Sequence, residues 1–487
     1  MTRSGKVALA ALLLASPLAA HAAPGSGDDI ATLRQQMQAM QKRLDAMEAA
    51  EKQRVAAAAQ VKTEAMKPTD VVASLPNGRP TLSTRDGEFT FQMFGRVHFD
   101  AASYFDQKKG TQDLNSGTNA RRIYWGVQGK FARDWEYELS VNAGGSGNDG
   151  PVNLLDARLT YAGLPGVKID IGYINPFLNL EEATSSNDIV FFERAAQSNI
   201  IEGLAGTDGR SAIGVRSNGD RWFAHSYLTG SAANNNPNGN SGDEQLAVIG
   251  RGVFLPYKSD RGVIHVGVNG TYVFQTPQLN TPGGKRVLNY SERPELRVDG
   301  TQFLNTSNNN ATGGSYNIDR AYEYGLEFLA IYDALHLQGQ YSRFGLDTRD
   351  ITVPGSAAKI SPNVEFSGWY AQASYMLTGE QKPYNIGTGA PGPLTPIRPF
   401  SLSEGGWGAW EVGLRYSTVN LNDASQGFIV NGGRQRVWTA ALNWYVNRNV
   451  RFLFDYINGD VDKHAFGTNA QTGVAFQAIA TRAQFNF

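Results

Sequence analysis

Arginine residues recur on the polar side of segments in which apolar and polar residues alternate. A guanidinium stays charged and offers a planar fork of donors that fits phosphate and carboxylate oxygens. A column of them along a water-filled passage would attract anions while holding each one weakly enough to release it. The positions that the alternation assigns to this side are Arg96, Arg122, Tyr124, Asp156, Arg158, Arg210, Arg216, Arg251, Arg415 and Arg482. The alternative is that these arginines pair with carboxylates and only brace a wall. The carboxylates on the same side are Glu136, Glu138, Asp156, Glu323 and Glu327.

The segments that carry these arginines read as β-strands. Phe89, Phe91 and Met93 point one way and Thr90 and Gln92 the other, with apolar bulk opposite polar groups. This pattern is typical of barrel strands with lipid outside and water inside, although a β-sandwich would show a similar one. Sixteen segments of this kind are expected near 89–101, 121–131, 135–143, 152–161, 167–175, 210–217, 221–229, 245–255, 263–274, 319–330, 334–343, 366–378, 408–419, 435–446, 449–459 and 474–487. The predicted fold class is all-β, a 16-stranded antiparallel transmembrane β-barrel with a short N-terminal coiled-coil helix.

Both ends of the chain favour the barrel. Residues 1–22 hold two basic residues, an apolar run and Ala20-His21-Ala22, the pattern of a cleaved secretion signal. The chain ends at Phe487, as expected of a closing strand whose aromatic residues lie in the interfacial girdle. After residue 23 no apolar run is long enough for a spanning helix, and in a bilayer only helices or closed barrels satisfy their backbone groups. The predicted location is the Gram-negative outer membrane, with its lipid as a partner.

Residues 23–55 are predicted to form a periplasmic coiled coil. Apolar residues recur there at alternating steps of three and four residues, namely Ile30, Leu33, Met37, Met40, Leu44 and Met47. A surface helix with one apolar stripe is the simpler alternative, but a lone helix this short is marginal in water, which favours self-association. Residues 56–87, rich in alanine and then in proline, asparagine and glycine, are expected as a linker, and residues 88–487 as the barrel.

Two connections stand out between the predicted strands. The aromatic stretch 176–209, which contains Phe191-Phe192-Glu193-Arg194, is predicted to fold into the barrel, because a barrel of this size otherwise leaves a wide hole. An external cap is the alternative. The connection 379–407 is long although it falls on the side of the short periplasmic turns.

No pattern in the chain indicates catalysis or metal binding. There is no cysteine, and the six histidines lack the spacing of paired metal ligands. Nucleophile-elbow, P-loop and nucleotide-binding motifs are missing as well. A net charge of −1 gives no hint of a nucleic-acid partner. Neither an enzyme activity nor a cofactor nor a metal is expected.

Short motifs recur across residues 88–487. They are Glu88-Phe89-Thr90-Phe91-Gln92-Met93-Phe94-Gly95-Arg96, Ala120-Arg121-Arg122-Ile123-Tyr124, Arg133-Asp134-Trp135, Asp156-Ala157-Arg158-Leu159-Thr160-Tyr161, Glu182-Ala183-Thr184-Ser185-Ser186, Glu193-Arg194, Arg293-Pro294-Glu295, Ser374-Tyr375-Met376-Leu377-Thr378-Gly379-Glu380-Gln381-Lys382-Pro383-Tyr384 and Leu442-Asn443-Trp444-Tyr445. In these stretches the chain resembles the phosphate-selective porins O and P. The resemblance implies a trimer of sixteen-stranded barrels, an arginine ladder in each pore, an infolded third loop and a long turn at 379–407. The positions that match ladder or constriction residues of that family are Arg96, Arg121, Arg122, Tyr124, Asp156 and Arg194.

The chain also departs from the family pattern near the constriction. Where strongly phosphate-selective members carry lysines, this sequence has Asp170, Glu182 and Asn187, and Glu295 follows Arg-Pro where a basic residue can occur. Two exchanges of a basic for an acidic residue change the local charge by about four units. A retuned constriction is therefore predicted.

The predicted function is a homotrimeric outer-membrane porin, a water-filled channel for small hydrophilic solutes that prefers anions such as phosphate or polyphosphate. The alternative in the same class is a general or sugar-type pore, with Tyr124, Phe191 and Phe192 as a sliding surface for sugars. A barrel lipase or protease would need a nucleophile and base that the sequence does not show. A plugged barrel that serves as a cell-wall tether would have no open-channel conductance. The residues expected to line the pore are Arg96, Arg121, Arg122, Tyr124, Asp156, Arg158, Arg194, Arg210 and Arg216, with Asp170, Glu182 and Asn187 at the constriction.

Overall fold

The computed structural model divides the chain into two compact units, Met1–Asp70 and Val71–Phe487. The predicted signal peptide at 1–22 and the first residues of the heptad segment lie outside the described residues. The structure describes residues 27–64, 69–108, 110, 112–145, 152–204, 209–231, 242–279, 284–307, 316–352 and 358–487.

The first unit holds one helix, α1 (Gly27–Glu64), of 38 residues. Its apolar seam faces solvent in the single chain, since Met37 is 67% exposed and Met47 71%. The helix continues past residue 55 into the expected linker because the sequence there is rich in alanine, the best helix former. No helix in the described part of the chain is long and apolar enough to cross a membrane.

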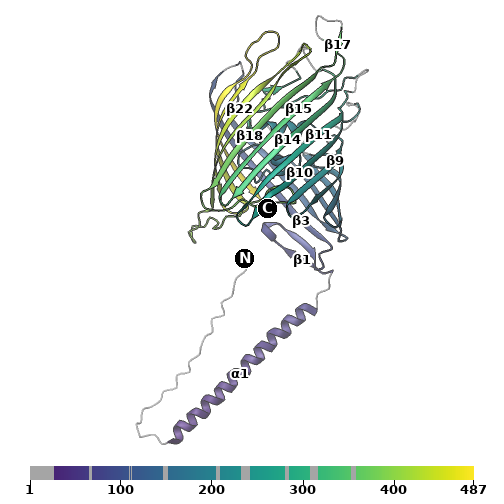
Figure 1. Ribbon diagram of the computed structural model, residues 1–487. Coiled ribbons are helices and arrows are strands. Elements are labelled where there is room, and N and C mark those ends of the chain that lie inside the picture. Colours follow the sequence, from purple (N-terminus) through teal and green to yellow (C-terminus); the bar gives the residue numbers. More distant parts are fainter. Residues whose placement is uncertain are drawn as a thin grey trace. The chain divides into compact units, whose positions relative to one another are not determined.

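The second unit is a closed antiparallel β-barrel (Figure 1). Within the described residues it has sixteen strands, so the predicted strand number is confirmed. They are β3 (Thr90–Lys108), β4 (Gly117–Phe131), β5 (Trp135–Asn142), β6 (Asn153–Leu164), β7 (Val167–Ile174), β8 (Arg210–Asn218), β9 (Trp222–Thr229) and β10 (Leu246–Ser259). The others are β11 (Gly262–Gln275), β14 (Ile318–Tyr332), β15 (Leu335–Thr348), β18 (Asn363–Met376), β21 (Ala409–Ser425), β22 (Phe428–Tyr445), β23 (Val450–Asp462) and β24 (Ala475–Asn486). β24 pairs with β3, and the amide of Phe487 extends this closure by donating to the carbonyl of Gly95 at 3.0 Å.

The two faces of the barrel follow the predicted alternation. On β3, Phe99 is 55% exposed outside while the next residue, Asp100, is 3% exposed inside. On β14, Leu326 and Phe328 point outward on either side of the buried Glu327. The outer face is therefore apolar and the interior carries the charges, as a barrel in lipid requires.

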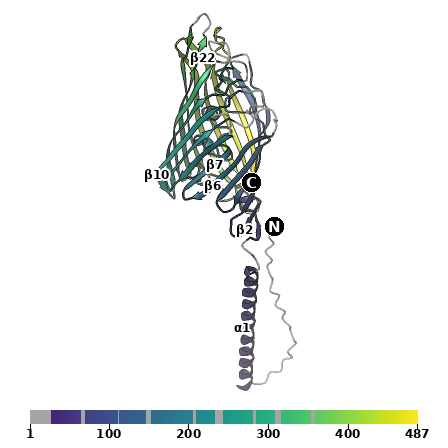
Figure 2. The same cartoon turned by 90° about the vertical axis from the view of Figure 1, so that its right-hand side faces the viewer.

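The strands are joined by short turns at one end, here called the turn end, and mostly by longer segments at the other, the loop end. The C-terminus and a small hairpin lie at the turn end (Figure 2). The hairpin consists of β1 (Val71–Ser74), the 3-10 turn η1 (Pro76–Gly78) and β2 (Thr81–Thr84), and β2 pairs with β3. The second half of the expected linker 56–87 thus continues the sheet instead of merely connecting the units.

Three segments fill the barrel. The infolded loop (residues 175–204) carries α2 (Leu180–Ala183) and α3 (Ala196–Leu204), and its Phe191 and Phe192 are 1% and 0% exposed. Infolding of this loop is thus confirmed. The cap (residues 284–307) carries the short strands β12 (Ser291–Glu292) and β13 (Leu304–Asn305) and buries apolar side chains against strands near the loop end. A further small hairpin there joins β16 (Ile351–Thr352) to β17 (Lys359–Ile360).

The third segment is the long connection between β18 and β21, the plug (residues 377–408). It carries β19 (Tyr384–Asn385) and β20 (Ala390–Pro391), and Ala390 is buried against Leu180 of the infolded loop and strand residues such as Phe223 and Val253. The guanidinium of Arg251 donates to the carbonyls of Thr388 and Gly389 at 2.8 Å each. The connection that was out of place among short turns therefore enters the barrel from the turn end.

Candidate functional site

Two consecutive arginines on β4 both face the interior, which a regular strand does not permit. On the neighbouring strand β3, His98 pairs with Arg122 and Phe99 with Ala120. Arg121 is therefore an extra residue without an opposite residue in the β-ladder, which makes it a β-bulge. Arg121 and Arg122 are 9% and 2% exposed. The bulge explains how the family-type position Arg121 and the alternation-derived position Arg122 come to share one site.

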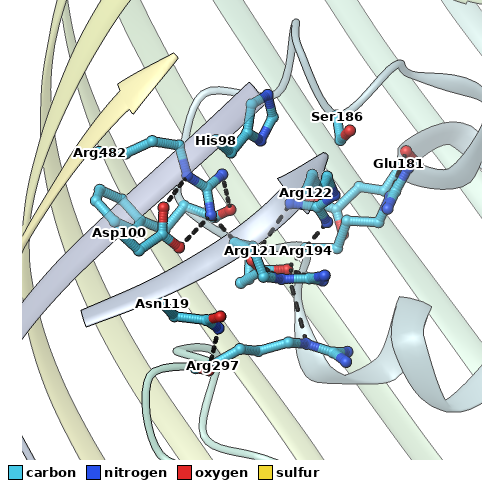
Figure 3. A network of polar contacts seen from close by, with 12 residues as sticks. His98, Asp100, Asn119, Arg121, Arg122, Glu181, Ser186, Arg194, Arg297 and Arg482 are labelled. Atoms are coloured by element: carbon cyan, nitrogen blue, oxygen red, sulfur yellow. Dashed lines mark hydrogen bonds and ion pairs between the residues drawn. The ribbon is translucent and has the colours of Figure 1, made fainter. Parts of the chain in front are cut away.

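Glu193 of the infolded loop is the centre of this site. Figure 3 shows Arg121, Arg122, Arg297 and Arg482, the arginines that interact with it. Its carboxylate accepts from Arg121 Nε at 2.7 Å and from Arg122 Nη2 at 3.2 Å. Arg482 of β24 donates to it at 3.1 Å and forks onto Asp100 at 2.6 and 2.7 Å. Arg297 of the cap lies 3.7 Å from the same carboxylate. Four arginines therefore converge on one loop residue, and together they hold the loop inside the barrel.

The electrostatics of this cluster favour an ionised Glu193. Burial alone would raise the pKa of its carboxyl, but the charges of Arg121, Arg122 and Arg482 outweigh burial and hold the pKa well below its ordinary value. The negative charge is thus permanent at neutral pH. It cancels part of the positive charge that the arginines bring to the lumen.

Most other interior arginines are also paired with carboxylates. The separations range from 2.6 to 3.2 Å in Arg415–Glu295, Arg251–Glu327, Arg158–Glu138, Arg216–Asp170 and Arg194–Glu182. Arg210 is fully buried and donates to the carbonyl of Glu202 at 2.9 Å. The lumen therefore contains a ladder of arginines whose charge is largely compensated.

The three departures from the family pattern lie in different places. Glu182 of α2 pairs with Arg194 and lines the constriction. Asp170 of β7 lies 2.8 Å from Arg216 and accepts from the Tyr227 hydroxyl at 2.7 Å, outside the lining of the constriction. Asn187 turns to the wall, where its side-chain oxygen lies 2.9 Å from His98 Nε2. The structure therefore brings only one of the three next to the passage.

The constriction is a cavity of about 460 Å³ bounded by the infolded loop, the plug and the wall formed by β3 to β6. Its charged lining consists of Arg79, Arg96, Arg158, Arg194, Glu138, Asp156 and Glu182. Tyr124 lines it too, and the Arg96 guanidinium carbon lies 4.8 Å from the centre of its ring. A second cavity of about 340 Å³ shares Gln128, Glu138 and Arg158 with the first and reaches towards the turn end. Together the two cavities trace a passage along this wall.

Arg96 holds a distinctive position in this passage. It donates to the hydroxyl of Ser185 at 3.1 Å and to that of Ser186. Within the described residues no carboxylate lies within 4.0 Å of it. Its positive charge is therefore not cancelled by a direct partner.

The alternation and the motifs did not reveal every residue of the site. Glu193 and Asp100 are visible in the sequence as acidic residues, but their partners lie far away in the chain. Arg79 falls in the expected linker and Arg297 in a loop without periodicity. No pattern in the sequence marks either as interior.

A closed antiparallel barrel with an apolar outer face and a charged, constricted interior defines a channel protein of the outer membrane. The particular kind of channel follows from comparison with known proteins. A model of the family described as phosphate-selective porin O and P matches residues 91–487. The chain belongs to this family, and it is a porin of the Gram-negative outer membrane that forms a water-filled channel for small hydrophilic solutes.

Several individual proteins are similar to this chain. Porin O of Pseudomonas aeruginosa is 26% identical over 435 residues, which cover 86% of this chain and 93% of that protein. An uncharacterised protein of Caulobacter vibrioides is 28% identical over 452 residues, which cover 88% and 83%. Similar solved structures include an anion-selective porin from Comamonas acidovorans, 12% identical with a TM-score of 0.47 and coverages of 82% and 100%. OmpT of Vibrio cholerae, in a trimer form, is 11% identical with a TM-score of 0.45 and coverages of 82% and 99%.

Proposed function

We propose that this porin prefers small anions and that Arg96 carries most of the preference. The supporting observation is its place in the constriction cavity without a carboxylate partner among the described residues. The hydroxyls of Ser185 and Ser186 beside it can donate to an oxyanion as well. An anion can therefore approach Arg96 without first breaking an ion pair.

The preference is proposed to be moderate, with phosphate as one permeant anion among several. The lining of the constriction carries four arginines and three carboxylates, a net charge of plus one. Arg158 and Arg194 each contact a carboxylate of the same lining. A compensated passage of this kind attracts anions weakly and releases them fast.

Arg121 and Arg122 are proposed to act on the pore through its shape. Both bind Glu193 and so fix the infolded loop that forms one side of the constriction. Arg210 and Arg216 likewise bind groups of the protein. In this proposal the ladder divides into one arginine that meets solutes and several that hold the wall and loop.

A sugar-type pore is the second candidate. Its sliding surface would need exposed aromatic residues, but Phe191 and Phe192 are buried under the guanidinium groups of Arg415 and Arg482 at 4.6 and 4.7 Å. Tyr124 alone of the three lines the constriction. The anion channel is therefore the better supported function.

The proposed assembly is a homotrimer in outer-membrane lipid, exported by the signal peptide at 1–22. The exposed seam of α1 supports a coiled coil between copies, because Met37, Met40, Leu44 and Met47 would be buried by it. The test is cross-linking with a trifunctional maleimide of a cysteine introduced at one seam position, because the reagent can join one thiol from each of three copies. Cross-linked trimers at the seam, and none from a position on the opposite face, are expected.

The proposed selectivity is tested in planar bilayers. The reversal potential across a KCl gradient gives the ratio of anion to cation permeability, and added phosphate reports block. We expect an anion-selective wild type whose ratio falls in Arg96→Ala and is nearly unchanged in Arg122→Ala if that variant folds. A wild type without charge preference would contradict the proposal and favour the general pore.

A further inference from the structure

Arg79 lies in the turn between β1 and β2, outside the ladder and the family motifs. Asn77 and Gly78 have positive φ values of 55° and 82°, so the chain reverses tightly before it. Pro80 follows, and a residue before proline is driven to extended backbone. Arg79 has φ −91° and ψ 120° accordingly. Its backbone direction is thus fixed by the residues on either side.

The turn is also fixed to the barrel. The side-chain amide of Asn449 donates to the carbonyls of Asn77 at 3.3 Å and Asn486 at 2.7 Å, which ties the turn to the end of β24. The Thr81 hydroxyl donates to the carbonyl of Arg79 at 3.1 Å and accepts from the Gln92 amide at 3.0 Å. The arginine therefore starts from a rigid position beside β3.

The side chain of Arg79 enters the constriction. It lines the same 460 Å³ cavity as Arg96, with its guanidinium carbon 6.0 Å from the centre of the Phe94 ring. Its guanidinium donates to the Gln92 side-chain oxygen over a long distance, 3.5 Å. Among the described residues no carboxylate lies within 4.0 Å of it. Arg79 is thus a second cation of the lining without a direct acidic partner.

The order of these groups along the passage follows from the strand. Gln92, Phe94 and Arg96 are alternate residues on the inner face of β3. Positions two residues apart along a strand are separated by about 7 Å. Since Arg79 contacts Gln92 and Phe94, it lies one step from Arg96 towards the turn end. In the second cavity beyond it, Lys130 and Arg158 are balanced by two glutamates. Without Arg79 that half of the passage would carry no surplus of positive charge.

We infer that Arg79 is a selectivity-determining residue. It forms a second binding site for small inorganic anions such as chloride and phosphate, between Arg96 and the opening of the passage at the turn end. The inference rests on the proposed anion preference and extends it. An anion that leaves Arg96 meets Arg79 next, so the positive potential continues along the passage. Cations meet the same potential as a second barrier.

The test is the permeability ratio in 0.1 M salt for Arg79→Ala, with Arg79→Gln as a second uncharged variant and Arg79→Lys to retain the charge. Arg85→Ala is the matched control, because Arg85 is exposed on the neighbouring turn and outside both cavities. A unit charge at about 7 Å, screened at this salt, is worth about a two- to threefold change in the ratio. We expect that fall in the two uncharged variants, and wild-type ratios in Arg79→Lys and Arg85→Ala.

Arg96→Ala is measured alongside to separate this inference from the proposed function. A reduced ratio in Arg96→Ala with wild-type ratios in both uncharged Arg79 variants would overturn the role of Arg79 and leave the proposed function standing. A fall in the Arg79 variants without one in Arg96→Ala would support Arg79 and overturn the assignment to Arg96. Wild-type ratios in all of them would overturn both.

Discussion

Glu182 offers the sharpest test of how charge in the constriction sets selectivity. It contributes one of three carboxylates to a lining with four arginines, and it lies 3.2 Å from Arg194. Arg194 also donates to the carbonyls of Glu181 at 2.9 Å and Thr184 at 3.2 Å, so it should stay in place when Glu182 is changed. Glu182→Gln therefore raises the net charge of the lining from plus one to plus two with little change of shape. Glu182→Lys raises it to plus three.

The size of the effect follows from Coulomb's law. A unit charge about 7 Å from a permeating ion is worth about 0.6 kcal/mol in water and about half of that in 0.1 M salt. Because the energy has opposite signs for anions and cations, each added charge should raise their permeability ratio about threefold. The expected increases are about threefold for Glu182→Gln and about ninefold for Glu182→Lys.

The assay is the reversal potential in 0.1 M and in 1 M KCl, followed by titration with phosphate. At 1 M the screening length is only about 3 Å, so the increases should nearly vanish. Phosphate should block Glu182→Lys at lower concentration than wild type. Glu404→Gln serves as the control, because Glu404 is an exposed acid of the plug outside the lining. Ratios that do not change at 0.1 M, or that change equally at both salt concentrations, would refute the electrostatic reasoning.

Other consequences concern the cluster around Glu193 and the N-terminal helix. Glu193→Gln should destabilise the barrel by about 3–5 kcal/mol, measured as a lower temperature of unfolding on heat-modifiability gels, because it leaves buried guanidinium groups without their counter-charge. Since the pKa of Glu193 is lowered in the folded barrel, its contribution to stability is fully present above its ordinary value of 4.5 and is lost as the pH falls through the lowered pKa. Melting curves of the wild type should therefore show this loss of stability only in acid. Glu193→Gln should lack this part of the pH dependence. An equal fall of the unfolding temperature in acid in both proteins would contradict the role of Glu193. Arg122→Ala should lower the unfolding temperature while the permeability ratio stays close to that of wild type, and a fall as large as in Arg96→Ala would contradict the division of roles. Removal of residues 27–64 should leave the conductance of each barrel unchanged and make trimers dissociate at lower temperature in detergent, and a changed conductance would show that the helix reaches the pore.

The strands could be predicted because lipid imposes a local rule on every one of them. Each residue on the outer face must be apolar, so a two-residue period such as Phe89, Phe91 and Met93 is visible without knowledge of the partners. The hairpin β1–β2 lies beyond the region under that rule, and its eight strand residues resemble a linker in composition. These residues form strands because β2 pairs with β3, and this tertiary contact cannot be recognised from the local sequence.

The site was harder to predict because it depends on register and on contacts between distant residues. The alternation assigns Arg122 to the interior but would turn Arg121 outward, and only the bulge brings both inside. Pairing of Glu193 with Arg482 joins positions 289 residues apart. The sequence shows that both kinds of charge occur, and it left open whether they pair.

The paired ladder has a physical reason. Ordering an infolded loop costs conformational entropy, so the loop needs favourable contacts to stay in place. Apolar packing alone would leave its buried charged groups without partners. Glu193 meets this need by accepting from arginines of β4 and β24, which lie on either side of β3. Every carboxylate used in this way subtracts from the field that ions feel. We therefore expect the selectivity of such a pore to be set by the few cations without a carboxylate partner among the described residues, here Arg96 and Arg79, and not by the number of arginines in the ladder.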